Sequence, residues 1–118
     1  MKIGIRRVYE PPEEGEGLRV LVDRLWPRGV RKEDLELDLW EKEIAPSPAL
    51  RKWFGHSPAR WEEFREKYAE ELDTPESLDR LREIVKAAGK RHITLLYGAR
   101  DPEHNHALIL ADAIQRLY

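Results

Sequence analysis

The chain has 118 residues, of which 21 are basic and 23 acidic, and it contains no cysteine. This length predicts a single domain spanning residues 1–118. The near balance of charge argues against a protein that binds nucleic acid over its whole surface, and the missing cysteines exclude disulfides, thiolate metal sites and cysteine nucleophiles. The start of the chain has no apolar signal core and no apolar run is long enough for a membrane span, so we expect a cytoplasmic protein. A single Asn and a single Gln beside abundant Glu and Arg resemble the composition of a thermophile's protein.

The first part of the chain predicts two strands separated by an acidic loop. Residues 2–9 carry apolar side chains in a β-like run. Residues 10–17 (EPPEEGEG) predict an exposed and mobile loop, because their prolines, glycines and glutamates leave nothing to bury. Residues 18–25 are almost continuously apolar, which is typical of a strand covered on both faces, and the following WPRG, residues 26–29, ends it. The loop is long enough either for a parallel pairing of the two strands or for a hairpin.

The rest of the chain predicts four helices and further strand segments. The alternating residues 35–40 indicate a short edge strand, and the apolar residues 91–97 indicate a second buried strand. Each helix is expected to begin where a small polar residue precedes a proline, because that pair suits the N-cap and the first helical position. The expected helices cover residues 48–54, 58–72, 75–88 and 102–117, with caps at Ser47, Ser57, Thr74 and Asp101. We therefore expect an α/β domain with a small, mostly parallel sheet flanked by helices.

Three blocks of sequence resemble a known family. They are residues 22–29 (VDRLWPRG), residues 50–56 (LRKWFGH), and residues 94–98 (TLLYG) running on to 104–107 (HNHA). On these blocks the chain is similar to the YeaO-like branch of domain-of-unknown-function family 488, over nearly its whole length. The resemblance implies an α/β fold and little about activity. Members of the wider family carry cysteines at positions that match Tyr97 and Asn105, so any thiol or metal chemistry of that wider branch is not expected here.

Charged side chains follow two predicted strands at the points where the strands end. Asp23, Arg24 and Arg28 come after residues 18–25, and Arg100 and Asp101 come after residues 91–97. If these strands are parallel neighbours, both sets emerge at the edge where open α/β sheets bind ligands, and the last helix points its N-terminus there. The three arginines would then form a basic cleft for a small anionic molecule with a phosphate or carboxylate group. The alternative is that the two aspartates pair with these arginines as structural salt bridges.

Two histidines lie near the start of the last predicted helix. His104 and His106 are two positions apart, so they face different sides of a helix and cannot share a metal as an i, i+4 pair could. The sequence therefore predicts no metal site and implies no cofactor. A histidine in the cleft could titrate near neutrality, so Asp23 or His106 would orient the ligand or move a proton. Alternatively, His104 is solvated and His106 packs against the sheet.

A second hypothesis is a non-catalytic module that binds nucleic acid or a protein through one basic loop. Trp26 lies beside Arg28 and could stack on a base, with Arg31 and Lys32 following in the sequence. A closed pocket with converging polar groups would favour the first hypothesis, and a convex basic strip would favour the second. The sequence has no phosphate-binding glycine loop, HExxH motif or nucleophile elbow, so it indicates none of those enzyme classes. Both an enzyme and a binding protein stay open at this point.

Overall fold

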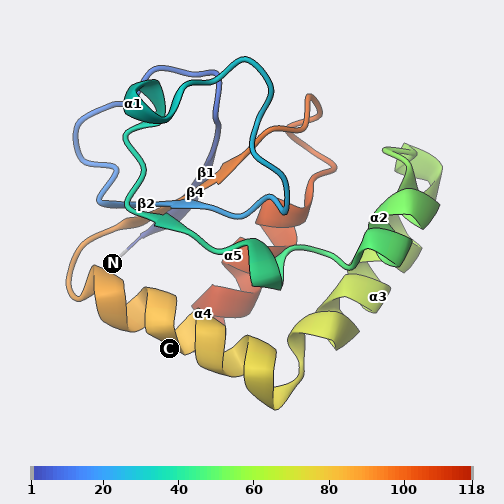
Figure 1. The fold of residues 1–118 in the computed structure, drawn as a ribbon. Coiled ribbons are helices and arrows are strands. Elements are labelled where there is room, and N and C mark those ends of the chain that lie inside the picture. Colours follow the sequence, from blue (N-terminus) through green and yellow to red (C-terminus); the bar gives the residue numbers. More distant parts are fainter. Residues whose placement is uncertain (1, 118) are drawn as a thin grey trace.

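Four parallel strands form one sheet in the computed structural model, which describes residues 2–117. The strands are β1 (Ile3–Arg7), β2 (Leu18–Leu21), β3 (Leu39–Trp40) and β4 (Ile93–Tyr97). Their order is β1-β4-β2-β3, and each neighbouring pair runs in parallel. The strand that comes last in the sequence therefore lies between the first two (Figure 1). The expected α/β fold with a small parallel sheet is confirmed.

The position of β4 decides how the first two strands relate. Ile5 and Val20 both lie opposite Leu95, one from each side. β1 and β2 therefore run in the same direction but do not pair with each other. The hairpin alternative is wrong. The alternative of a parallel pairing is correct in direction only, because β4 lies between the two strands and pairs with both.

The acidic loop between β1 and β2 is tied to the sheet at its far end. Residues 10–15 are exposed as expected, but the Glu16 carboxylate is mostly covered, with its side chain 11% exposed. The Thr94 hydroxyl donates to the Glu16 carbonyl at 2.8 Å. Gly17 has a φ of +73°, and a Cβ there would lie 2.1 Å from the His92 carbonyl oxygen. The expectation that nothing in this loop is buried is therefore wrong at Glu16, because a glycine lets the chain pass directly against β4. The mobility of the loop stays a prediction.

Two of the four helix starts lie where the sequence places them. The helices are α1 (Lys32–Leu35), α2 (Pro48–Phe54), α3 (Trp61–Leu72), α4 (Pro75–Ala88) and α5 (His106–Gln115), with 3₁₀ turns at Lys42–Ile44 and Pro58–Arg60. The Ser47 and Thr74 hydroxyls each accept a hydrogen bond from a backbone N–H at 3.2 Å, three residues on. These bonds fix the starts of α2 and α4 as N-caps do.

The other two helix starts are corrections. Ser57 makes no capping hydrogen bond, and Pro58 opens a 3₁₀ turn that leads into α3. Asp101 is not a cap, because its carboxylate accepts from the Glu103 N–H at 2.9 Å and closes a local turn instead. α5 begins only at His106, where the Asn105 side chain caps it by accepting from a backbone N–H at 3.3 Å.

Two strand predictions also need correction. The expected strand over residues 18–25 ends at Leu21, and Leu25 is 62% exposed beyond it. The expected edge strand over residues 35–40 is reduced to β3, because Leu35 ends α1 and Glu36 takes a left-handed conformation with a φ of 50°. Both patterns contain buried leucines, but in both the chain turns away from the sheet.

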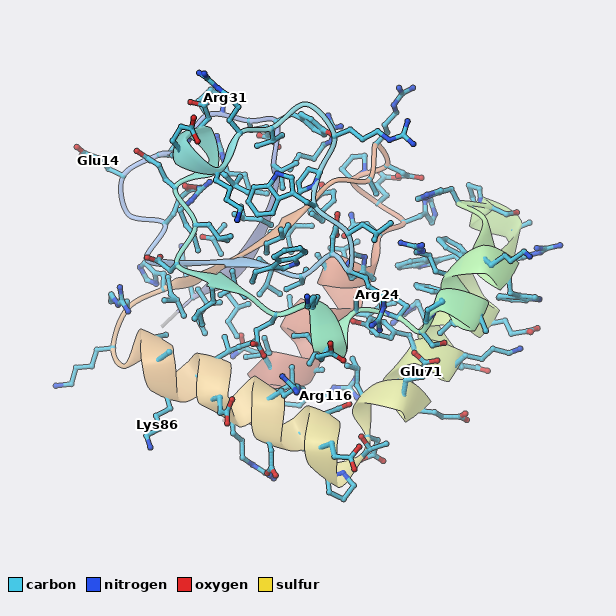
Figure 2. All side chains as sticks on the ribbon, viewed as in Figure 1. Glu14, Arg24, Arg31, Glu71, Lys86 and Arg116 are labelled. Atoms are coloured by element: carbon cyan, nitrogen blue, oxygen red, sulfur yellow. The ribbon has the colours of Figure 1, made fainter. Side chains whose placement is uncertain are left out.

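The sheet is covered on both faces, by different kinds of structure. Leu95 faces a large core with α2, α3, α4 and α5, whereas the next residue, Leu96, faces a smaller cluster with Leu35 of α1 and Trp26. Figure 1 shows α1 and its long flanking loops on the side of the sheet away from α4 and α5. Labelled charged side chains such as Glu14, Arg31 and Lys86 point outward from this body in Figure 2. Helices α2, α3, α4 and α5 therefore build one layer, the sheet builds a second, and α1 with its irregular flanking loops builds the third.

Candidate functional site

A cavity of about 250 Å³ lies at the carboxyl edge of β2 and β4. Its walls come from the loop after β2, the segment leading into α2, α2 and α3, the loop after β4 and the start of α5. The titratable lining side chains are Asp23, Arg24, Arg51, His56, His104 and His106. The carboxyl edge of a parallel sheet is where open α/β folds place ligands. This cavity is therefore the candidate functional site.

The ends of β2 and β4 are joined by one side chain. The Asp23 carboxylate accepts a hydrogen bond from the Gly98 N–H at 2.8 Å through its Oδ2. A Cβ on Gly98 would lie 3.0 Å from that oxygen, so the absence of a side chain eases the approach. Because β2 and β4 are parallel neighbours, residues just past their ends meet as the sequence hypothesis requires.

His106, the first residue of α5, reaches back to the same strand end. Its Nε2 lies 2.9 Å from the Val22 carbonyl oxygen and 3.3 Å from Oδ1 of Asp23. A carbonyl only accepts hydrogen bonds, so Nε2 carries a proton and donates it, which leaves Nδ1 as the acceptor of a neutral ring. Burial lowers the pKa of His106 and raises the pKa of Asp23. The pair is therefore a positioned donor–acceptor unit whose surroundings disfavour both charges.

Two arginines line the cavity without a carboxylate partner. Arg24 points toward the segment that leads into α2 (Figure 2), where its Nη2 donates to the carbonyls of Ala45 at 3.2 Å and Pro46 at 3.5 Å. Arg51 extends from α2, and its positive charge lowers the pKa of Asp23 against the larger effect of burial. Neither arginine forms an ion pair with a carboxylate among residues 2–117. Both guanidinium groups thus keep capacity for an external anion.

The three-arginine cleft of the sequence hypothesis is not the observed arrangement. Arg24 lines the cavity, but Arg28 and Arg100 are exposed and do not contribute to its walls. Arg28 lies in the loop that covers the other face of the sheet, where its carbonyl accepts from the Tyr9 hydroxyl at 3.0 Å. Arg51 is the residue that sequence reasoning missed. It stands in the block of residues 50–56, but nothing in that block indicates which edge of the sheet its helix reaches.

The alternative of aspartate–arginine salt bridges is also not what the described residues show. Asp23 lies beside His106 instead, and the Asp101 carboxylate lies 2.8 Å from Nδ1 of His104. The Glu103 N–H and the His104 side chain lower the pKa of Asp101. His104 precedes α5, so both histidines reach the cavity even though they are two positions apart. Residues 2–117 contain no cluster of three His, Asp or Glu side chains that could hold a metal ion.

The loop of the second hypothesis uses its aromatic residue inside the protein. The indole N–H of Trp26 donates to the Val30 carbonyl at 2.7 Å, and its ring lies edge-on to Trp40 with centroids 5.4 Å apart. Arg31 pairs with Asp34 at 3.0 Å, while Lys32 begins α1. Trp26 therefore packs in the smaller core, which leaves it poorly placed to stack on a base.

Comparison with known proteins gives the family. The family model described as "Inactive DUF488-N3 subclade" matches residues 2–118. The chain belongs to this DUF488-N3i family. It is 49% identical over 118 residues to the uncharacterised protein YeaO of Escherichia coli (strain K12), covering 99% of this chain and 100% of YeaO. It is 40% identical over 113 residues to the uncharacterised protein Rv3073c of Mycobacterium tuberculosis, covering 96% of this chain and 93% of that protein.

The comparison confirms the resemblance seen in the sequence. No solved structure matches this DUF488-N3i chain. Among the described residues, no helix combines the length and the apolar character that crossing a membrane requires. The two positions that match cysteines of the wider family serve packing and capping here, since Tyr97 is buried in the larger core and Asn105 caps α5.

Proposed function

We propose that this protein binds a small anionic molecule in the cavity at the carboxyl edge of the sheet, and that it does so without catalysing a reaction. One observation carries the proposal: Arg24 and Arg51 line one cavity and have no carboxylate partner among the described residues. The start of α5 forms part of the same wall, and a helix N-terminus favours negative charge. Concave sites with a few converging polar groups are the usual form of small-molecule sites.

Two observations support binding rather than catalysis. The matching family is described as an inactive subclade. In addition, the Val22 carbonyl already takes the proton on Nε2 of His106, so this nitrogen is not free to accept a proton from a substrate. On this proposal Asp23 and His106 orient the ligand and hold the end of β2 against α5.

The test is anion-dependent stabilisation of matched variants. Thermal unfolding is measured in acetate, phosphate and chloride at equal ionic strength, for wild type, for the cavity variant Arg24→Met/Arg51→Met, and for the control Arg28→Met/Arg100→Met. Both double variants lose two positive charges, but only the first removes arginines from the cavity. We expect acetate or phosphate to raise the Tm of wild type and control above their values in chloride, because a ligand that binds only the folded state stabilises it.

The comparison between variants separates a site from a general salt effect. Excluded salts stabilise proteins without any binding site, so an equal rise in all three proteins contradicts the proposal. If the double cavity variant does not fold cooperatively, the single variants Arg24→Met and Arg51→Met are each compared with Arg28→Met. Isothermal titration at constant ionic strength then reports binding directly.

A further inference from the structure

The cavity walls are only partly polar. Their apolar side chains are Leu25, Ala45, Pro46, Phe54, Phe64 and Ala99. Phe54 and Phe64 stack with ring centroids 4.3 Å apart and form an aromatic wall from α2 and α3. Leu25 is 62% exposed, and among the described residues only Tyr9 is the other large apolar side chain left exposed. Leu25 therefore offers apolar surface at the cavity, and covering such surface with an apolar part of a ligand is favourable.

The charges around the cavity nearly balance. Arg24 and Arg51 contribute two positive charges, and an ionised Asp23 contributes one negative charge. His104 lies against the carboxylate of Asp101, which is outside the lining. One positive charge is therefore left uncompensated when the histidines are neutral. A group with one negative charge matches this excess, whereas a phosphate monoester carries about −1.5 to −2 at pH 7 and would also face the Asp23 carboxylate.

The volume of the cavity suits a ligand that carries one ring. An engineered apolar cavity of about 150 Å³ is known to hold benzene. The cavity here measures about 250 Å³, which leaves room for one ring and a small polar group. A planar carboxylate also suits the fork of a guanidinium group, which can donate two parallel hydrogen bonds to it.

From these three properties we infer that the ligand is a monocarboxylate with one ring-sized apolar body, its carboxylate held by Arg24 and Arg51 and its body covered by Leu25 and the Phe54–Phe64 wall. This inference rests on the proposed function and narrows it to one class of anion. Benzoate and cyclohexanecarboxylate represent this class. Acetate lacks the body, benzyl alcohol lacks the charge, and phenyl phosphate carries too much charge.

Isothermal titration with these five compounds at constant ionic strength tests the inference. We expect benzoate or cyclohexanecarboxylate to bind at least about tenfold more tightly than acetate, because burial of a ring adds apolar contact. Benzyl alcohol should bind at least about tenfold more weakly than benzoate, because it forms no charge-assisted bond. Phenyl phosphate should bind no more tightly than benzoate.

Two exposed apolar residues give a matched pair of variants. Leu25→Ser should weaken benzoate binding several-fold and leave acetate binding unchanged, whereas Tyr9→Ser should change neither, because Tyr9 lies outside the cavity lining. Both side chains are exposed, so neither change should prevent folding. Equal effects of Leu25→Ser on acetate and benzoate, or no effect on either, would contradict a body packed against Leu25.

The outcomes distinguish this inference from the function on which it rests. If acetate or phosphate binds through Arg24 and Arg51 as tightly as benzoate does, the protein binds anions but the ring-bearing carboxylate is wrong. If no anion binds, both the inference and the proposed function are wrong. If benzyl alcohol binds as tightly as benzoate, the arginines do not hold this ligand and the inference is wrong, whereas the proposed function is still decided by the acetate and phosphate measurements on the arginine variants.

Discussion

The arginines on the face of the sheet and those at its edge differ in how fully the fold uses them. Arg19 of β2 is 7% exposed, and its guanidinium group donates to the carbonyls of Glu36 at 3.0 Å and Leu35 at 2.8 Å and to the Glu16 carboxylate. Arg24, five residues further on, donates only to two carbonyls, at 3.2 Å and 3.5 Å. All three guanidinium nitrogens of Arg19 therefore donate to groups of the protein, whereas only Nη2 of Arg24 does so.

The difference follows from where each side chain emerges. Arg19 points to the face of β2 that α1 covers, and a charge enclosed there must be paired. Arg24 lies past the end of β2, beside a cavity, so an external group can reach its guanidinium. A full set of internal partners marks an arginine as structural, and an incomplete set beside a cavity marks it as a candidate for ligand binding.

The largest expected effect comes from removing the buried guanidinium group of Arg19. Arg19→Met should lower the free energy of unfolding by about 3–5 kcal/mol, because it leaves the Glu16 carboxylate poorly compensated. Arg6, 3.3 Å from that carboxylate, offsets part of the loss. Arg24→Met should cost less than about 1 kcal/mol, since it breaks only long bonds to carbonyls. Urea unfolding measures both.

A double variant serves as the control for this contrast. Arg19→Met/Glu16→Gln removes the uncompensated charge and should recover part of the stability lost in Arg19→Met. If Arg24→Met costs as much as Arg19→Met, the distinction between the two arginines is wrong.

The loop that carries Glu16 gives the second contrast. Gly17→Ala should lower the free energy of unfolding by about 2–3 kcal/mol. Alanine is strained at the positive φ of this position, and its Cβ would also push the chain away from the His92 carbonyl. Gly15 has a φ of +83°, but a Cβ there would meet nothing within 4 Å. Gly15→Ala should therefore cost only about 1–2 kcal/mol from conformational strain. Thermal or urea unfolding that gives equal losses would show that the loop does not press against β4.

The same comparison explains which parts of the structure the sequence predicts. α2 and α4 were predictable because Ser47 and Thr74 act locally, through bonds to N–H groups three residues on. The proline after Asp101 gives the same signal, but this aspartate closes a turn with Glu103, and side-chain patterns alone do not separate these two uses of a short polar residue. A short polar side chain therefore predicts a helix start well only where the N–H group three residues on is its one local partner.

The candidate site was predictable only in part, for a similar reason. Parallel strands bring Asp23 and the start of α5 to one edge, so the meeting of Asp23 with His106 follows from topology. Arg28 and Arg100 do not line the cavity. The sequence could not predict this, because the spacing of residues does not determine the course of a loop beyond a strand. Arg51 reaches the cavity through the packing of α2 on α3, which is a tertiary property.

A smaller effect is expected at the helix starts, where Thr74 makes a capping hydrogen bond and Ser57 does not. Thr74→Ala should cost about 0.5–2 kcal/mol, the usual loss for an N-cap whose oxygen accepts a backbone hydrogen bond. Ser57→Ala should change stability by no more than about 0.5 kcal/mol, because Ser57 makes no such bond. Both residues precede a proline, so urea unfolding of this pair isolates the capping bond. Equal losses would show that the hydroxyl of Thr74 does not act as a cap.

The smallest expected effect concerns pH and the histidine at the edge of the cavity. Burial lowers the pKa of His106 in the folded protein below its unfolded value of about 6.5. The folded state therefore binds this proton less tightly than the unfolded state does. Stability linked to His106 is fully present above about pH 6.5 and is lost as the pH falls from there through the lowered folded pKa.

The raised pKa of Asp23 acts in the opposite direction, so the two effects partly cancel in the wild type. Its stabilising contribution is present below the unfolded pKa of about 3.9 and is lost as the pH rises through the folded value. One proton can change the free energy of unfolding by roughly 1.4 kcal/mol per pH unit. We expect the free energy of unfolding of wild type to fall by a fraction of this amount per unit between pH 7.5 and pH 5.5. His106→Gln, whose amide can still donate to Val22, should lose less over the same range.

His92→Asn is the matched control, because His92 is exposed and lies outside the cavity lining, and an asparagine oxygen can replace its Nδ1, which accepts from the Lys2 N–H at 2.9 Å. This variant should keep the pH dependence of wild type. Urea unfolding at pH 7.5 and pH 5.5 gives the pH dependence of the free energy of unfolding for wild type and for both variants. If His106→Gln and His92→Asn flatten the pH dependence of the free energy of unfolding equally, the proton in question does not belong to the buried ring of His106. His106 would then be an open group like Arg24, available to the ligand, rather than one whose partners the fold has already supplied.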